Sequence, residues 1–141
     1  MTYVDLKDFE EKIVTEKVKL FFLCILHNPV GRVWTTDELT AMGDLCFKYG
    51  VIVVSDEIHS DFVFEGTHHV FANLKEKYQN ITVTCTAPGK TFNLAGLQTS
   101  NIFIPNPKLR KLFQKQLDET GYSQLNAAVA AWRLKVSRNE N

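Results

Sequence analysis

Three side chains of different chemistry each follow an apolar, β-branched run of this sequence. They are Asn28 after residues 20–26, Asp56 after residues 51–54, and Lys90 after residues 81–86. A lysine held in a turn at the end of a strand can attack a carbonyl group as an amine and can also move protons. A carboxylate and an amide beside it could orient the compound that the amine holds.

The apolar runs indicate the elements that would position these groups. A continuous apolar run is typical of a parallel strand that is covered on both faces. Open α/β sheets bind ligands outside the carboxyl ends of their strands, so neighbouring parallel strands would bring Asn28, Asp56 and Lys90 to one pocket. Taken singly, each residue also has a simpler role: a turn residue for Asn28, a cap for Asp56 and a solvated loop lysine for Lys90.

Helices are predicted before and between these strands. Apolar residues at steps of three and four predict an amphipathic helix over about 5–15. Thr35 and Glu38 have the spacing of a capping box, which predicts a second helix that Gly50 ends. Residues 60–79 are irregular, apart from a short helix near 71–74.

The second half of the chain adds a strand and two helices. Too few residues separate the strand 100–104 from the Lys90 turn for a helical crossover, so we expect it to be antiparallel to its neighbour. Helices are predicted over 107–119 and 124–135. The first would turn four apolar residues inward: Leu109, Leu112, Phe113 and Leu117. This order predicts an α/β fold, a mostly parallel sheet with helices on both faces, in a single domain over 1–141.

Composition bounds the possible functions. Sixteen acidic and sixteen basic residues give no net charge, so we expect neither a nucleic-acid partner nor an anionic membrane partner. There is no long apolar run and no signal-peptide pattern at the start, and the three widely spaced cysteines suggest reduced thiols in a cytoplasmic protein. The four histidines lack metal-ligand spacing, so no metal site is expected, and His68 and His69 are expected to be solvated.

Three segments in this order resemble the fold-type I enzymes that depend on pyridoxal 5′-phosphate (PLP), the aspartate aminotransferase superfamily. They are H-N-P-V-G-R-V-W-T at 27–35, V-S-D-E-I-H-S-D at 54–61 and K-T-F-N-L-A-G-L-Q at 90–98. Within that superfamily they look most like the cystathionine β-lyases of the MalY/PatB type, the C–S lyase subfamily. The resemblance covers about 1–131 and leaves a divergent tail at 132–141. Family members are much longer, so we expect this chain to be a fragment of their large, cofactor-binding domain.

The resemblance implies a role for each residue at the predicted edge. Lys90 would form the Schiff base with PLP, and Asp56 would pair with the pyridinium nitrogen. Asn28 would bond the phenolic oxygen of the cofactor. His59 stands where aminotransferases commonly carry a tyrosine that bonds the same oxygen, and it could donate there or simply line the pocket.

The phosphate contacts of the family are less well matched. Thr86 and Thr91 are candidates to contact phosphate, whereas Ala87 and Gln98 stand where many relatives carry a serine and an arginine. The early Gly-Thr turn, the aromatic ring that stacks on the cofactor and the substrate-binding arginine of the family have no counterpart here. We therefore expect the isolated chain to be inactive.

The predicted function is a PLP-dependent aminotransferase or C–S β-lyase acting on a small amino acid such as cystathionine or cysteine, in a homo-oligomer. The sequence does not separate lyase from transaminase. One alternative is a P-loop nucleotide binder, because Gly89, Lys90 and Thr91 follow a strand, but Thr84 stands where that motif needs its first glycine. The other is an inert α/β remnant that only self-associates.

Overall fold

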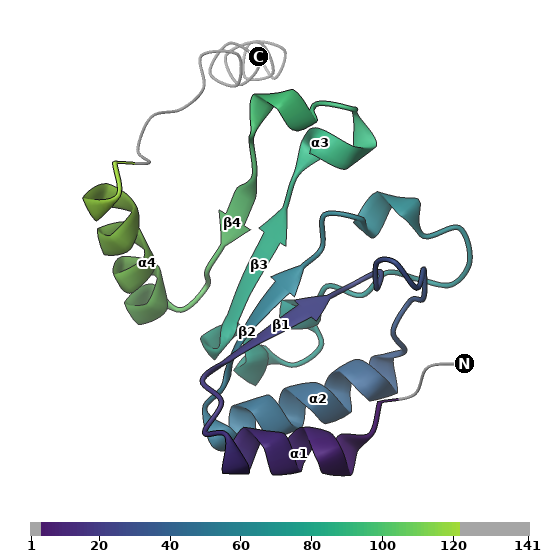
Figure 1. Ribbon diagram of the computed structural model, residues 1–141, viewed down its shortest axis with the longest axis vertical. Coiled ribbons are helices and arrows are strands. Elements are labelled where there is room, and N and C mark those ends of the chain that lie inside the picture. Colours follow the sequence, from purple (N-terminus) through teal and green to yellow (C-terminus); the bar gives the residue numbers. More distant parts are fainter. Residues whose placement is uncertain (1–3, 122–141) are drawn as a thin grey trace.

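The arrangement of the strands agrees with the sequence pattern. A computed structural model describes residues 4–121 and contains a sheet with strand order β1-β2-β3-β4 (Figure 1). The strands β1 (Leu20–Cys24), β2 (Ile52–Asp56) and β3 (Thr82–Thr86) pair in parallel, and β4 (Asn101–Phe103) pairs antiparallel to β3. The predicted α/β class, mostly parallel sheet and antiparallel last strand are thereby confirmed.

The described helices are of two types, α-helices and 3-10 turns. The α-helices are α1 (Leu6–Thr15), α2 (Thr36–Tyr49), the single-turn α3 (Pro88–Thr91) and α4 (Pro107–Glu119). The short 3-10 turns are η1 (Ser60–Phe62), η2 (Phe71–Asn73), η3 (Glu76–Asn80) and η4 (Ala95–Leu97). None of these helices is both long and apolar enough to cross a membrane.

Helix α2 begins and ends where its sequence signals predict. The Thr35 hydroxyl accepts a hydrogen bond from the Glu38 backbone N–H at 3.2 Å, and the Glu38 carboxylate accepts one from the Thr35 N–H at 3.0 Å. This reciprocal pair satisfies two of the backbone donors that a helix start leaves without partners. At the other end, Gly50 takes a left-handed conformation with φ of 67°, which glycine adopts without steric cost.

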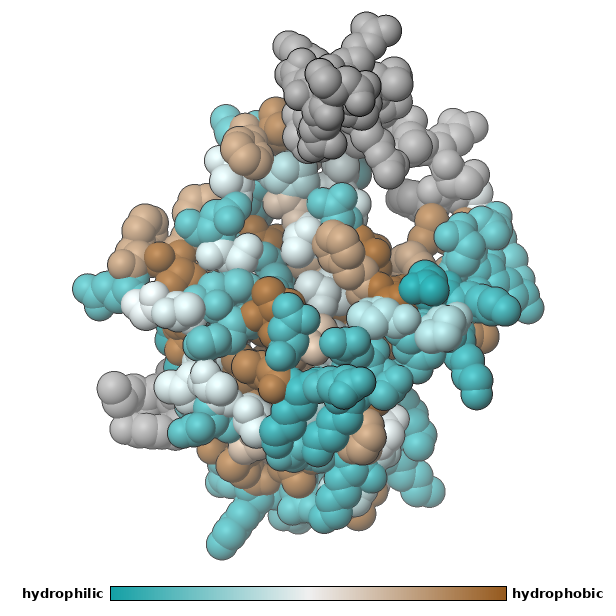
Figure 2. Space-filling model, turned by 180° about the vertical axis from the view of Figure 1, so that it is seen from behind, coloured by the Kyte–Doolittle hydropathy of each residue, from teal (hydrophilic) through white to brown (hydrophobic). Residues whose placement is uncertain are grey.

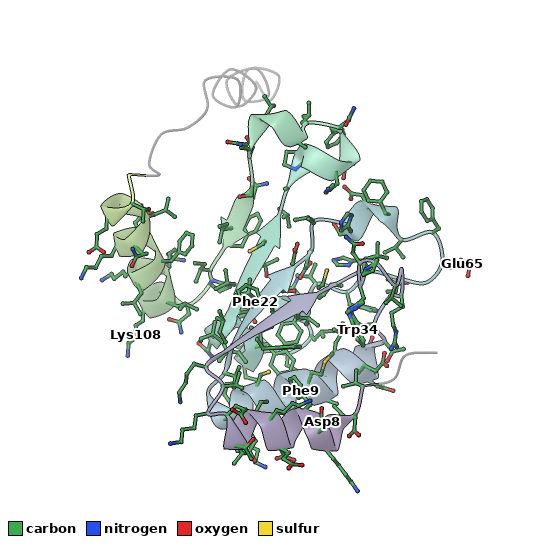
Figure 3. The ribbon with its side chains drawn as sticks, viewed as in Figure 1. Asp8, Phe9, Phe22, Trp34, Glu65 and Lys108 are labelled. Atoms are coloured by element: carbon green, nitrogen blue, oxygen red, sulfur yellow. The ribbon has the colours of Figure 1, made fainter. Side chains whose placement is uncertain are left out.

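The core lies between the sheet and helices α1 and α2, which pack on the same face. Side chains of both helices share one buried cluster with alternate residues of β1 and β2, among them Leu23 and Val53. Phe9 of α1 reaches the sheet, where its ring centroid lies 4.9 Å from that of Phe21 (Figure 3). Tyr78 is fully buried, and its hydroxyl donates to the Thr40 carbonyl of α2. Alternation along each strand therefore assigns one sheet face to this core.

The opposite face of the sheet is open among the described residues. In residues 4–121 no helix buries this face, and Phe22 on it is 70% exposed. Figure 2 shows the molecule from behind, with hydrophobic residues scattered among hydrophilic ones on that side. A continuous apolar run in a strand indicates that both faces of the sheet are suited to burial. It does not indicate which part of a protein covers each face.

Helix α4 forms as predicted but packs less than predicted. It lies beside β4 rather than over the sheet (Figure 1), and none of its residues is buried. Leu112 is 67% exposed, so the expectation of an inward apolar stripe was wrong at that position. The predicted helix 124–135 and the tail 132–141 lie outside the described residues.

Candidate active site

The three predicted segments leave the sheet at one edge. Cys24, Asp56 and Cys85 stand in register on the three parallel strands. The ladder continues one step further, because Ile25 N–H donates to Asp56 O and Glu57 N–H donates to Cys85 O, both at 2.9 Å. The loops that carry Asn28, Asp56 and Lys90 therefore begin side by side, as the sequence predicts.

Asn28 is exposed in a tight turn that closes β1. The turn is held by a bridge between His27 and Arg32, with the His27 N–H donating to the Arg32 carbonyl at 2.9 Å. The Trp34 indole N–H donates to the Cys24 carbonyl at 2.9 Å and so fixes the returning chain against the strand (Figure 3). The Asn28 amide makes no side-chain hydrogen bond to the described residues, which leaves it available for a ligand.

Asp56 is the last residue of β2 and is half-buried on the open face. One carboxylate oxygen accepts a hydrogen bond from the Ile58 N–H at 3.2 Å. Among the described residues nothing bonds the second oxygen. Burial, together with the nearby carboxylates of Asp56 and Glu57, raises the pKa of the Cys85 thiol. Cys85 is therefore kept as a neutral thiol beside this edge.

Glu57 was not singled out from the sequence, although it is the more buried of the two neighbouring carboxylates. It is 2% exposed and accepts hydrogen bonds from the Ser55 hydroxyl at 2.8 Å and the Phe71 N–H at 3.3 Å. His68 Nε2 lies 2.8 Å from its other oxygen, so the expectation that His68 is solvated was wrong. The alternation of strand residues is the signal that could have placed Glu57 on the covered face.

His59 and Lys90 lie on the two loops that follow β2 and β3. His59 is half-buried just before η1, with its ring 6.0 Å from that of Phe62. Lys90 is exposed on α3 and forms no hydrogen bond or ion pair with the described residues. Its amine is therefore accessible. The P-loop alternative does not fit, because Thr84 is buried inside β3 and α3 ends at Thr91 instead of opening a long helix.

The two threonines considered for phosphate binding differ in their partners. Thr91 donates its hydroxyl proton to the Asp61 carboxylate at 2.6 Å, so this group is already engaged within the chain. The Thr86 hydroxyl accepts from the Asn101 amide at 3.4 Å and keeps its own proton free. Of the two, only Thr86 could donate to a phosphate without breaking a bond seen here.

Two clefts open near this edge, of about 840 and 800 Å³, which are sizes that suit small molecules. The first is lined by Glu57, Asp61, Thr86, Ala87, Phe92 and Asn101, among others. The predicted site residues Asn28, Asp56, His59 and Lys90 line neither cleft. Residues 4–121 contain no group of three side chains that could hold a metal ion.

The mostly parallel α/β sheet carries an amine, a carboxylate and an amide on the loops that follow its parallel strands, where open α/β sheets bind ligands. The sequence profile of the family described as aminotransferase class I and II matches residues 2–138. The chain belongs to this family.

Individual relatives agree with the resemblance to C–S lyases. The cystathionine β-lyase PatB of Bacillus subtilis is 48% identical over 137 residues, which are 96% of this chain and 35% of that protein. A cystathionine β-lyase of Corynebacterium glutamicum is 36% identical over 82% of this chain and 31% of its own length. The chain thus spans about a third of the length of these curated relatives.

Solved structures show the same fold. A PLP-bound putative aminotransferase from Clostridium difficile has a TM-score of 0.81 and 45% identity, over 87% of this chain and 31% of that one. Cystalysin from Treponema denticola, which contains PLP, has a TM-score of 0.80 and 42% identity, over 84% of this chain and 30% of that one. The fold-type I assignment made from the three motifs is confirmed.

Proposed function

We propose that this chain supplies the cofactor-holding edge of a PLP-dependent enzyme, a C–S β-lyase or aminotransferase for a small amino acid. The observation that supports the proposal is that the loops carrying Asn28, Asp56 and Lys90 begin side by side at the ends of three parallel strands. Their chemistry fits the cofactor: an accessible amine for its aldehyde, a carboxylate oxygen without a described partner for its ring nitrogen, and an amide for its phenolic oxygen.

Each residue has a defined task in this proposal. When bound, PLP supplies an electron-withdrawing ring that stabilises negative charge at the substrate Cα. Lys90 would hold the aldehyde and, once displaced by the substrate amine, would take the proton from Cα. Asp56 would keep the ring nitrogen protonated, because a fixed carboxylate favours the positive form of its partner. Asn28 and His59 would donate to the phenolic oxygen.

The choice between lyase and transaminase lies after this common step. In β-elimination the Cα proton and the thiol at Cβ are both lost, and hydrolysis of the remaining enamine gives pyruvate and ammonia. Relatives described as cystathionine β-lyases and C–S lyases favour elimination from a cystathionine-like or cysteine-like amino acid. We further propose a cytoplasmic homo-oligomer. The isolated chain should turn over little substrate, because the family's early Gly-Thr turn, stacking aromatic ring and substrate-binding arginine have no counterpart in it.

Covalent trapping tests the proposal. PLP is added to the chain, the absorbance of a lysine-bound cofactor is recorded, and borohydride reduction followed by peptide mapping identifies the modified lysine. We expect the label on Lys90, its loss in Lys90→Ala, and its weakening in Asp56→Ala. The matched control is Lys108→Ala, since Lys108 lies on α4, away from the strand ends (Figure 3). Label on Lys108 or Lys111 with Lys90 unmodified would refute the assignment, and no label at all would favour the inert remnant.

A further inference from the structure

Helix α3, which carries Lys90, has little support of its own. It is four residues long, and Ala87 at its start offers no side-chain cap. Its backbone bonds are local, from the Phe92 N–H to Pro88 O at 3.0 Å and from the Leu94 N–H to Gly89 O at 2.9 Å. Such bonds define the shape of the turn, but they do not fix its position relative to the loop that follows β2.

One side-chain hydrogen bond crosses between these loops. The Thr91 hydroxyl donates to the Asp61 carboxylate at 2.6 Å, a short bond to a charged acceptor. Within residues 4–121 no other hydrogen bond or ion pair joins α3 to a different helix or strand. Asp61 belongs to η1 and follows Asp56 and His59 in the same loop. The bond therefore connects the segment of the predicted carboxylate to the segment of the predicted amine.

The bond also sets the direction of the lysine. Successive residues of an α-helix point about 100° apart around its axis. With Thr91 turned toward η1, the preceding residue Lys90 points about 100° away from that direction around the helix axis, and its side chain is exposed. The same bond thus orients the helix and leaves the amine without a competing partner among the described residues.

We propose that Asp61 is a positioning residue for Lys90 and acts through Thr91, an inference that rests on the function proposed above. Asp61 touches neither cofactor nor substrate in this role. It holds α3 against the β2 loop, so that the amine stays at a fixed distance from the Asp56 carboxylate. This role goes beyond the one considered for Thr91 from the sequence, which was contact with phosphate.

Paired variants separate the hydrogen bond from general loop packing. Thr91→Val and Asp61→Ala remove the bond, whereas Thr91→Ser and Asp61→Asn keep a donor and an acceptor. Thr99→Val is the matched control, because among the described residues the Thr99 hydroxyl bonds just the nearby Leu97 carbonyl. Amide hydrogen exchange over residues 88–94 is measured without PLP, and the rate of borohydride-trapped label on Lys90 is measured with it.

We expect exchange over 88–94 to become about three- to tenfold faster in Thr91→Val and Asp61→Ala, the effect of losing one hydrogen bond. Labelling of Lys90 should slow in the same two variants and not in the other three. The double variant should match either single one, because both remove the same bond.

Parent-like exchange in Thr91→Val and Asp61→Ala would overturn the inference, as would additive effects in the double variant. Circular dichroism checks that each variant is folded. If one of the two bond-removing variants does not fold, the other alone still tests the inference. Absence of label on Lys90 in the parent chain would instead refute the proposed function, since the exchange measurement involves no cofactor.

Discussion

Replacing Gly43 by alanine should destabilise this protein, although alanine is the better helix former. A Cβ at Gly43 would lie 2.7 Å from Tyr78 Cζ and 2.9 Å from Tyr78 Cε2, well inside van der Waals contact. The tyrosine ring has little room to yield. It is fully buried and stacks on Phe71 at 5.1 Å, and its hydroxyl lies 2.9 Å from the Thr40 carbonyl.

The expected change in the free energy of unfolding is the sum of two losses and one gain. Overpacking a core costs about 1–3 kcal/mol, and loosening the tyrosine hydroxyl bond adds about 1 kcal/mol. Exchanging glycine for alanine in a helix interior returns about 1 kcal/mol. The net loss should therefore be about 1–3 kcal/mol, a large part of the stability of a small domain.

Urea unfolding followed by circular dichroism measures this loss as a lower midpoint with an unchanged slope. Gly96→Ala is the matched control, because a Cβ there meets nothing within 4 Å and its φ is ordinary. That variant should be neutral or slightly more stable. A Gly43→Ala protein as stable as the parent would show that Tyr78 moves freely, and the packing argument would fail.

Three further outcomes follow from charges and exposure. Hydrogen bonds from Lys75 and Lys77 lower the pKa of Asp44 from the ordinary 3.8 to about 2. Its contribution to stability is therefore complete above about pH 4 and is lost as the pH falls toward about 2. In Asp44→Asn the free energy of unfolding, measured in urea, should depend less on pH across that window. The change should be modest, because the ion pairs are partly exposed, and a pH dependence equal to that of the parent would contradict this. Burial raises the pKa of Cys46 to about 12, so mass spectrometry should find this thiol alkylated only after unfolding, and modification in the folded state would count against it. Phe22→Thr should reduce light scattering at high concentration with little loss of stability, because Phe22 is 70% exposed, whereas unchanged scattering would exclude the open face from self-association.

The strand ends could be predicted from the sequence because each depends on a local pattern. An apolar run followed by a polar turn defines the end of a strand whatever lies next to it. Parallel pairing then places Asn28, Asp56 and Lys90 at one edge without any knowledge of side-chain contacts. The limits of α2 were predictable for the same reason, since Thr35, Glu38 and Gly50 act on backbone groups within a few residues.

Contacts between distant loops could not be predicted in this way. Glu57 and His68 meet because residues 58–67 fold back over the end of β2, and no periodicity in that stretch describes the path. Asp61 and Thr91 are thirty positions apart, and each is an ordinary loop residue when considered alone. Helix α4 shows the same limit, because an apolar stripe at helical spacing indicates a face suited to burial but does not supply a partner.

The two adjacent carboxylates of the D-E-I-H segment show how the fold divides work between chemically similar groups. Successive strand residues point to opposite faces, so Asp56 and Glu57 cannot share a role. Glu57 points into the covered face, where Ser55, Phe71 and His68 surround its carboxylate, and it stabilises the return of the loop. Asp56 points to the open face with one oxygen that no described residue bonds. Only the second arrangement leaves a negative charge available to a cationic partner, and this is why we assign the ring nitrogen to Asp56 and not to its more buried neighbour.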